Sequence, residues 1–399
     1  MRLLYIFLDA TRSSGVIKKV KSKIEFLNRS GIETTGIFIN KNIKDYKIDL
    51  SEHITYVPLI IQPLQLIFNR RYIRNYKWFF EKNNYYRQLY SVLQKEIEKH
   101  KFDLILFRYP LSNRYLYKFI KRYPEKIIFE HNSKELTELN LRDYQKVKYF
   151  VDSEIKYGDK VLSLSRALTG VGNELVEYER KRTHGYNIPV KVVPNSFEVE
   201  SVPVRGMPEL KEKIKILFLT GSPFPWVGID ILLKSISGYE KKNKIEVFIV
   251  GPMVKEYQDY CADNAILDIV FFEGEKSGEE LNKYFDQCHV AFGTLAMQRV
   301  GLKEHSSLKV LEYASRGMPF VITYSDTNFF NTKEFGDFYL QLPFSETGID
   351  LDKVVQFATL VTQKQDHPQK LRDLSKSKID VSISMKILKD FLTELNEKR

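Results

Sequence analysis

Short apolar runs alternate with longer amphipathic stretches along the whole chain. The short runs predict buried strands and the amphipathic stretches predict helices, an alternation typical of parallel α/β architecture. In the first half, strands are expected at Leu3–Leu8, Thr35–Ile39, Ile54–Val57, Leu104–Phe107, Ile127–Phe129, Val161–Leu164 and Val190–Val193. In the second half, they are expected at Ile216–Thr220, Glu246–Val250, Ile269–Phe272, Val290–Phe292, Phe320–Thr323 and Phe338–Leu340.

A connector over residues 195–213 separates the two series, because prolines and a run of charges interrupt the pattern there. Ligands of doubly wound sheets gather at the carboxyl ends of the strands, so two such domains are expected to face one cleft. We predict an N-terminal Rossmann-like domain over residues 1–200, a C-terminal Rossmann-like domain over residues 201–375, and a last helix over residues 376–399 that packs back on the first domain.

The length of 399 residues suits two domains, and 43% apolar with 13% aromatic residues is the composition of a globular protein. Two cysteines, Cys261 and Cys288, offer no disulfide framework and suit a reducing compartment. The first apolar run stops at Asp9, too short for a signal-peptide core or a membrane span. We therefore expect a cytoplasmic protein.

Charge is distributed unevenly between the two halves. Residues 1–200 hold 36 Lys and Arg against 23 Asp and Glu, whereas the remaining residues hold 26 against 28. The basic first half is expected to face something anionic, such as a phosphorylated lipid or a membrane surface. A generic lysine-rich surface is the alternative. No familiar nucleic-acid recognition motif is present, so nucleic acid is not an expected partner.

The segment 301–323, GLKEHSSLKVLEYASRGMPFVIT, carries the richest chemistry. Ser306 and Ser307 stand where a helix is expected to begin, and free amides at a helix start attract anions. Lys309 adds a positive charge for a pyrophosphate. Glu312 lies over one turn further on, within reach of a ribose diol, and Glu304 precedes the helix, where it can accept hydrogen bonds from sugar hydroxyls.

This segment resembles the E-x7-E motif of the family 4 glycosyltransferases, here EHSSLKVLE. The resemblance implies the GT-B fold and a retaining hexosyltransferase that takes a UDP- or GDP-sugar. The departing phosphate would take the proton of the acceptor, and no protein nucleophile, cofactor or metal is expected. The resemblance implies catalytic roles for His131 and Glu304, and donor binding by Ser14, Gly15, Gly221, Ser222, Ser306, Ser307, Leu308, Lys309 and Glu312.

Other stretches match the same family in the expected order. Ser14-Gly15 stands in place of the Gly-Gly loop after the first strand, and FEHNSKE places His131 at a strand end. VVPNSFE is similar to the Pro-Asn-Gly signature that closes the first domain. FLTGSPFPWVGIDILL departs from the family pattern, because Ser222 and Val227 replace the usual Arg and Lys. The missing charges are expected from Lys309, Lys303 or Arg299 together with backbone amides.

Candidate acceptor residues follow the strands of the first domain. Arg108 ends one strand and could bind an acceptor phosphate or form an ordinary loop salt bridge, and Asn132 follows His131. The Asp350-Leu351-Asp352 stretch is expected to open a helix rather than bind a metal, and the histidines show no ligand spacing.

Residues 58–80 combine an apolar stretch with basic and aromatic side chains, which fits either a membrane-surface segment or a core helix. The basic first half favours the membrane, and hence a glycan on a lipid carrier as acceptor, in cell-surface polysaccharide biosynthesis. The alternatives are a non-catalytic nucleotide- or glycan-binding relative and a GT-B-type nucleotide-sugar epimerase. The oxidoreductase class is disfavoured, because no G-x-G-x-x-G follows the first strand.

Overall fold

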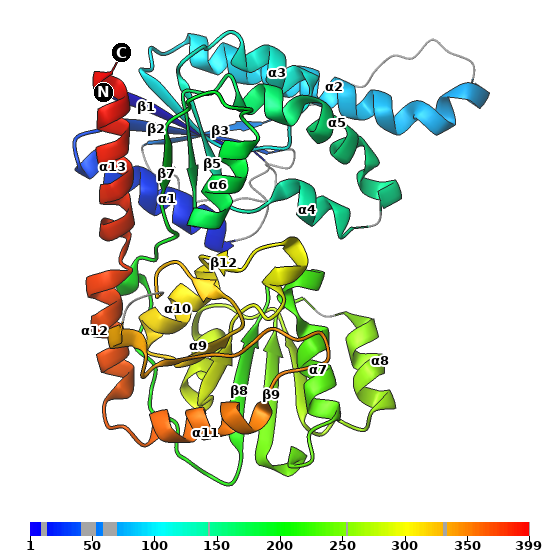
Figure 1. The fold of residues 1–399 in the computed structure, drawn as a ribbon, viewed down its shortest axis with the longest axis vertical. Coiled ribbons are helices and arrows are strands. Elements are labelled where there is room, and N and C mark those ends of the chain that lie inside the picture. Colours follow the sequence, from blue (N-terminus) through cyan, green and yellow to red (C-terminus); the bar gives the residue numbers. More distant parts are fainter. Residues whose placement is uncertain are drawn as a thin grey trace. The chain divides into compact units, whose positions relative to one another are not determined.

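The chain divides into two compact units in a computed structural model (Figure 1). The structure describes residues 1–8, 14–40, 53–58, 70–142, 144–252, 254–329 and 333–398. The first unit comprises residues 1–193 together with 385–399, and the second comprises residues 194–384. None of the helices in these ranges is long and apolar enough to cross a membrane.

The first unit is built on a seven-stranded sheet in which every neighbouring pair is parallel. Its order is β3-β2-β1-β4-β5-β6-β7, so the strand order reverses beside β1. The strands are β1 (Arg2–Leu8), β2 (Glu33–Asn40), β3 (Ile54–Pro58), β4 (Leu104–Arg108), β5 (Ile127–His131), β6 (Ala167–Gly170) and β7 (Val190–Val192).

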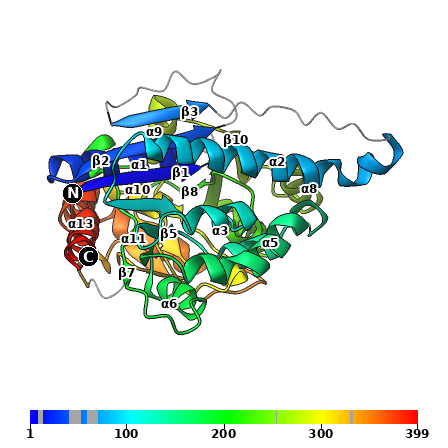
Figure 2. The ribbon, with the colours of Figure 1, turned by 90° about the horizontal axis from the view of Figure 1, so that it is seen from above.

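Helices cover both faces of this sheet. The helices α2, α3 and α5 lie side by side on one face, over a core that includes Leu4 and Phe107 (Figure 2). The helix α1 covers the opposite face, where Ile24 packs so closely on Gly36 that a Cβ there would lie 2.6 Å from it. The helices of this unit are α1 (Ser14–Arg29), α2 (Arg70–Glu98), α3 (Arg114–Ile120), α4 (Glu135–Asn140), α5 (Tyr144–Leu162), α6 (Asn173–Lys181) and, from Met385 on, α13 (Val381–Glu397).

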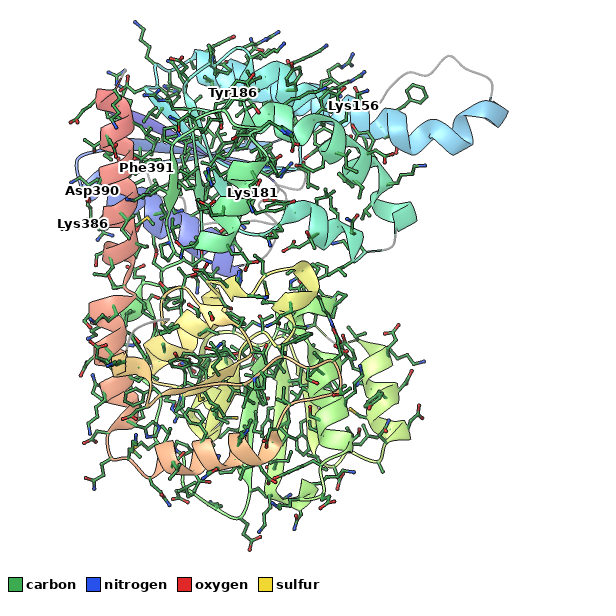
Figure 3. All side chains as sticks on the ribbon, in the orientation of Figure 1. Lys156, Lys181, Tyr186, Lys386, Asp390 and Phe391 are labelled. Carbon is green, nitrogen blue, oxygen red and sulfur yellow. The ribbon has the colours of Figure 1, made fainter. Side chains whose placement is uncertain are left out.

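The last helix, α13, is amphipathic. Phe391 is buried whereas Lys386 and Asp390 are exposed (Figure 3). Arg166 donates a hydrogen bond of 2.9 Å to the carbonyl oxygen of Leu395, which adds a polar tie to the apolar contact. The chain thus returns to the first unit after the second unit is complete.

The second unit has a six-stranded parallel sheet of order β10-β9-β8-β11-β13-β15 and a small two-stranded sheet, β12-β14. Its strands are β8 (Ile214–Leu219), β9 (Ile245–Val250), β10 (Val270–Gly274), β11 (Val290–Phe292), β12 (Glu304–His305), β13 (Phe320–Ile322), β14 (Ser325–Asp326) and β15 (Tyr339–Gln341). Its helices are α7 (Ile229–Ser237), α8 (Lys255–Asp263), α9 (Gly278–Gln287), α10 (Leu308–Arg316), α11 (Leu351–Thr362) and α12 (His367–Lys378).

Two Rossmann-like parallel α/β units confirm the predicted fold class, but one predicted strand is wrong. Residues 161–164 do not form a strand, because Val161 and Leu162 complete the buried face of α5. The strand lies a few residues later, at Ala167–Gly170. A run of four apolar residues fits a buried helix end as well as a strand, and the true strand contains Thr and Gly.

Candidate functional site

The end of β8 and the start of α10 meet in the second unit. The ammonium group of Lys309 donates to the carbonyl oxygen of Leu219 at 3.0 Å. The Leu219 amide donates to the Tyr313 hydroxyl at 3.2 Å. The loop that starts with Gly221 and Ser222 therefore leaves the sheet beside the helix that carries Lys309, although the two segments are far apart in the sequence.

The loop before α10 is anchored by Ser306, which is fully buried. The Asn195 amide donates to the Ser306 hydroxyl at 3.0 Å, and the Asn195 side chain donates to the Ser306 carbonyl at 2.6 Å. The Asn328 side chain also donates to the Ser306 hydroxyl, at 2.7 Å. Ser306 thus fixes the position from which the helix begins.

Ser307 is the N-cap residue of α10, as expected, but its side chain forms no capping hydrogen bond. Instead, the Ser307 amide donates to a carboxylate oxygen of Asp326 at 3.3 Å. Burial raises the pKa of Asp326 to about 7. Helix starts leave several amides without intrahelical partners, and no hydroxyl of Ser307 covers them here.

Lys309 is the positive group of this site. Burial lowers the pKa of Lys309 to about 8. The ammonium group lies 5.3 Å from the centre of the Phe218 ring. No carboxylate in the described part of the chain forms an ion pair with it, so its charge is available to an anion.

The two glutamates of the motif are placed differently. Glu312 accepts a hydrogen bond of 2.9 Å from Arg316, one turn further along α10, through one of its two carboxylate oxygens. Glu304 lies on β12, where Thr327 donates to it at 3.3 Å. Both side chains are partly exposed.

Arg299, one of the predicted replacements for the missing phosphate charges, is already neutralised. Its guanidinium contacts Asp230 at 2.8 Å and also pairs with Glu346. The nearby loop is held by its own contacts, because Thr220 donates to the Ser222 carbonyl at 2.8 Å. Of Arg299 and Lys309, Lys309 is therefore the cation better placed to bind a phosphate.

A second group of charges lies at the carboxyl end of the sheet of the first unit. Buried Glu130 accepts hydrogen bonds from the Tyr5 hydroxyl at 2.7 Å and contacts Lys23 at 2.9 Å and Lys19 at 3.4 Å. Burial alone would raise the pKa of Glu130, but Lys23 and Lys19 hold it well below its usual range. Lys19 also donates to Asn132 at 2.9 Å, and burial lowers the pKa of Lys19 to about 7.

Arg108 ends β4 in this same region, with its guanidinium 5.6 Å from the centre of the Phe7 ring. No described carboxylate forms an ion pair with Arg108. Lys19 and Lys23 were not predicted as site residues from the sequence. Their spacing could have indicated them, because two lysines four residues apart on an amphipathic helix lie on the same face.

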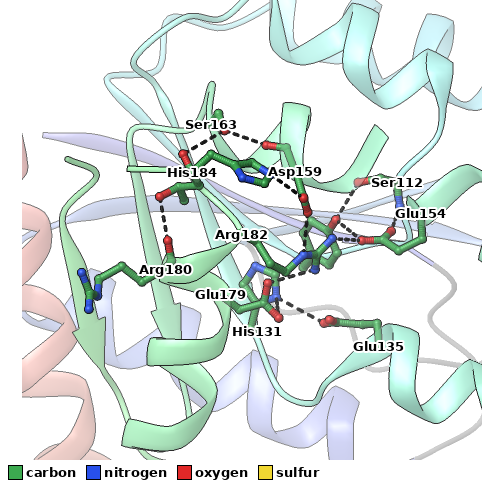
Figure 4. Close-up of polar contacts among 12 residues, drawn as sticks. Ser112, His131, Glu135, Glu154, Asp159, Ser163, Glu179, Arg180, Arg182 and His184 are labelled. Atoms are coloured by element: carbon green, nitrogen blue, oxygen red, sulfur yellow. Dashed lines mark hydrogen bonds and ion pairs between the residues drawn. The ribbon is translucent and has the colours of Figure 1, made fainter. Parts of the chain in front are cut away.

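His131, at the end of β5, lies beside Glu135 and Glu179 (Figure 4). It is fully buried, and its ring stacks on that of Tyr109 with 4.3 Å between the centroids. Its Nδ1 lies 3.3 Å from an oxygen of Glu135 and 3.4 Å from an oxygen of Glu179. Burial lowers the pKa of His131. These three side chains form a set that could hold a metal ion, found within the described residues. No motif in the sequence indicated Glu179, which the fold brings from α6.

Some predicted residues lie outside what the structure describes. The surroundings of Ser14 and Gly15, predicted donor-binding residues at the start of α1, are not described. Of the predicted membrane segment 58–80, residues 59–69 and the side chains of residues 70–79 are not described either. The prediction for Asp350 is confirmed, because it caps α11 by accepting a hydrogen bond of 3.0 Å from the Lys353 amide.

Comparisons with known proteins agree with this architecture. Residues 205–329 match the family described as glycosyl transferases group 1. No curated protein matches the chain by sequence.

Solved structures of similar fold cover both units. Sucrose-phosphate synthase from Thermosynechococcus elongatus has 12% identity and a TM-score of 0.73, with 100% of each chain covered. The lipopolysaccharide outer core galactosyltransferase WaaB has 14% identity and a TM-score of 0.63, with 99% of each chain covered. Anabaena HepE in complex with UDP-glucose has 12% identity and a TM-score of 0.62, with 99% of this chain and 100% of that chain covered. The chain therefore has the GT-B fold of two Rossmann-like units, and residues 205–329 of its second unit match the glycosyl transferases group 1.

Proposed function

We propose that this protein is a glycosyltransferase that moves a sugar from a UDP- or GDP-sugar to a glycan or lipid-linked acceptor. One observation carries the proposal: the un-neutralised ammonium group of Lys309 lies at the start of α10, against the end of β8. These elements lie within the stretch that matches the glycosyl transferases group 1. HepE, a protein of similar fold, was solved with UDP-glucose, which supports a nucleotide-sugar as donor.

In this proposal the donor diphosphate binds at the start of α10. The amides of Leu308 and Lys309, the Lys309 ammonium and the Gly221–Ser222 loop surround it, with Ser306 and Ser307 fixing the backbone. The second oxygen of Glu312 receives a ribose hydroxyl, and Glu304 accepts hydrogen bonds from the sugar. Lys309 and the backbone amides thereby supply the positive charge that the family's Arg and Lys would give at positions 222 and 227, which are Ser222 and Val227 here.

The chemistry requires stabilisation of a leaving group. Negative charge grows on the departing diphosphate, and an ammonium group held in a desolvated position stabilises that charge more strongly than it would in water. We propose transfer with retention, in which the departing phosphate takes the proton of the acceptor hydroxyl. Glu304 then acts by holding the sugar. His131 remains a predicted catalytic residue.

The acceptor is assigned to the first unit. Lys23 and Arg108 lie near the carboxylate of Glu130 together with Lys19, and the side-chain amide nitrogen of Asn132 is buried without a hydrogen-bond partner. An acceptor phosphate, as a lipid carrier would provide, suits these basic groups and this free donor. We propose that the protein works at the inner face of the cell membrane, in cell-surface polysaccharide biosynthesis.

A ligand screen followed by an activity assay tests the proposal. UDP, GDP and ADP and their sugars are screened by thermal shift, and the stabilising donor is then incubated with a lipid-linked acceptor and with the free sugar. Transfer to the lipid-linked acceptor, with the anomeric configuration retained by NMR, is the expected result. Donor binding without transfer would indicate a non-catalytic relative, and release of an epimerised sugar would indicate an epimerase.

A further inference from the structure

Three side chains converge inside the first unit, apart from the donor site. His131 ends β5, Glu135 begins α4 and Glu179 lies on α6 (Figure 4). One nitrogen or oxygen of each lies within 4.8 Å of the others. His131 and Glu179 are buried, and the Glu135 side chain is only 14% exposed.

Several atoms of this cluster are buried without a hydrogen-bond partner. They are both ring nitrogens of His131, one oxygen of Glu135 and one oxygen of Glu179. Buried polar atoms are nearly always paired, and an unpaired one costs free energy. The Nδ1 atom can donate at most one proton, so it cannot satisfy both carboxylates by itself.

Three buried or nearly buried carboxyl groups, those of Glu135, Glu179 and Glu154, are gathered beside His131. Among the described residues, the cation that pairs with them is Arg182, which contacts Glu154 at 2.6 Å and Glu179 at 3.0 Å. Asp159 also contacts Arg182, but it is partly exposed and pairs with His184. Burial raises the pKa of Glu135 well above its usual range and the pKa of Glu179 to about 7, and a divalent cation in place of those protons would let both groups ionise.

The spacing of the atoms suits metal coordination. Tetrahedral ligands with bonds of about 2.1 Å lie about 3.4 Å apart. The Nδ1 of His131 lies 3.3 Å from Glu135 and 3.4 Å from Glu179. Arg182 holds the other oxygen of Glu179, the kind of outer hydrogen bond that orients a ligating carboxylate.

We propose that His131, Glu135 and Glu179 bind one divalent cation of the Mn²⁺ to Zn²⁺ series, which joins β5, α4 and α6. An imidazole with two carboxylates matches this class better than Ca²⁺ or Mg²⁺, which prefer oxygen ligands alone. The proposal revises the expectation of no metal, which rested on the family resemblance, on Asp350-Leu351-Asp352 as a helix start and on the spacing of the histidines. Its ligands all lie in the first unit, so it does not depend on the diphosphate site at Lys309. It does change the role of His131, which would bind the cation and not act as the catalytic residue that the resemblance implied.

Metal binding to the full chain tests the proposal without an activity assay. The protein is treated with EDTA, desalted, and titrated with Zn²⁺ and Mn²⁺ by calorimetry, with thermal unfolding followed in parallel. One cation per chain and a raised Tm are expected. The d–d absorption of the Co²⁺-loaded protein reports the coordination geometry, and a change of this spectrum in His131→Gln would show that the imidazole is a ligand.

Three variants and one control define the site. Glu179→Gln, Glu135→Gln and His131→Gln are each expected to weaken binding at least about tenfold. Glu177→Gln on the same helix α6, which removes an exposed partner of Arg180, is expected to bind as the wild type does. Circular dichroism checks the folding of each variant, and the partly exposed Glu135 gives the mildest change. No binding by the wild type, or equal binding by Glu135→Gln, would overturn the proposal.

Discussion

The ammonium group of Lys309 lies 3.0 Å from the carbonyl oxygen of Leu219, so the first turn of α10 is held against the end of β8. This contact brings the start of α10, the loop after β8 and a partly buried cation together. We propose that the donor diphosphate binds there. Removal of the charge is expected to weaken donor binding more than it weakens the fold.

Lys309→Met should therefore lose donor affinity. A hydrogen bond to a charged group contributes about 1.5–3 kcal/mol, so the Kd of the nucleoside diphosphate is expected to rise about 10- to 100-fold. Calorimetric titration measures the change. Lys353→Met removes a mostly exposed lysine of the same unit and serves as the control, with an unchanged Kd. Equal affinity in wild type and Lys309→Met would exclude the assigned role.

Donor affinity should also depend on pH through Lys309. The pKa of Lys309 is lowered to about 8, so the group is charged below that pH and neutral above it. An anion binds the charged form, and above pH 8 binding must first take up a proton. The Kd is expected to rise about tenfold per pH unit there. Lys309→Arg stays charged, so a pH dependence as steep as that of the wild type would contradict this account.

Glu312 is expected to bind the donor through the oxygen that Arg316 leaves unused. Glu312→Ala should raise the Kd for the nucleotide at least about tenfold, because a lost charged hydrogen bond has that size. The loss of the pair with Arg316 should cost stability by less than about 1 kcal/mol. Glu280→Ala, an exposed change on α9, is the control for binding. A variant that loses stability but keeps its Kd would show a purely structural glutamate.

Asn195 is expected to stabilise the protein by anchoring the backbone at Ser306, just before α10. Asn195→Ala removes a hydrogen bond to the carbonyl of buried Ser306, and leaving that oxygen unpaired is expected to cost about 1–3 kcal/mol of the free energy of unfolding. Denaturant unfolding measures the difference. Asn243→Ala, at an exposed position, should change stability by less than about 0.5 kcal/mol. Similar losses in the two variants would contradict the anchoring role.

Asp326 gives stability a defined pH dependence. The pKa of Asp326 is raised by burial to about 7, above the value of about 4 expected in the unfolded chain. The folded state therefore keeps a proton that the unfolded state releases, and this stabilisation, full below about pH 4, is lost as the pH rises toward 7. The loss is at most about 1.4 kcal/mol per pH unit.

The side chain in Asp326→Asn cannot titrate, so this variant should lack the part of the pH dependence of stability that Asp326 causes. Urea unfolding at several pH values between 4 and 8 compares the two proteins. The expected result is that the wild type loses stability relative to Asp326→Asn across that range. Parallel curves would mean that Asp326 does not hold a proton in the folded state.

The sequence predicted the strands well because buried parallel strands are short, continuous apolar runs. It predicted the start of α10 because Ser-Ser followed by an apolar helical pattern is a local signal. Residues 161–164 were assigned wrongly because a short apolar run also fits the buried end of a helix. Local patterns of this kind suffice to predict a strand or helix when its own apolar residues determine which side chains are buried.

Contacts over long sequence separations could not be predicted in the same way. Asn195 bonds to Ser306 although 111 residues separate them in the sequence. Glu179 reaches His131 because α6 follows β6, the neighbour of β5 in the sheet. The ion pair of Arg299 with Asp230 could not be predicted either, because no spacing in the sequence indicates it.

A crystal structure of the protein with UDP or GDP would show whether the diphosphate binds at the start of α10. Diphosphate oxygens are expected within about 3 Å of the Lys309 ammonium and of the first amides of α10, with a ribose hydroxyl on Glu312. A nucleotide bound elsewhere in the second unit, or only in the first unit, with Lys309 still on the Leu219 carbonyl and no phosphate beside it, would rule out this donor site.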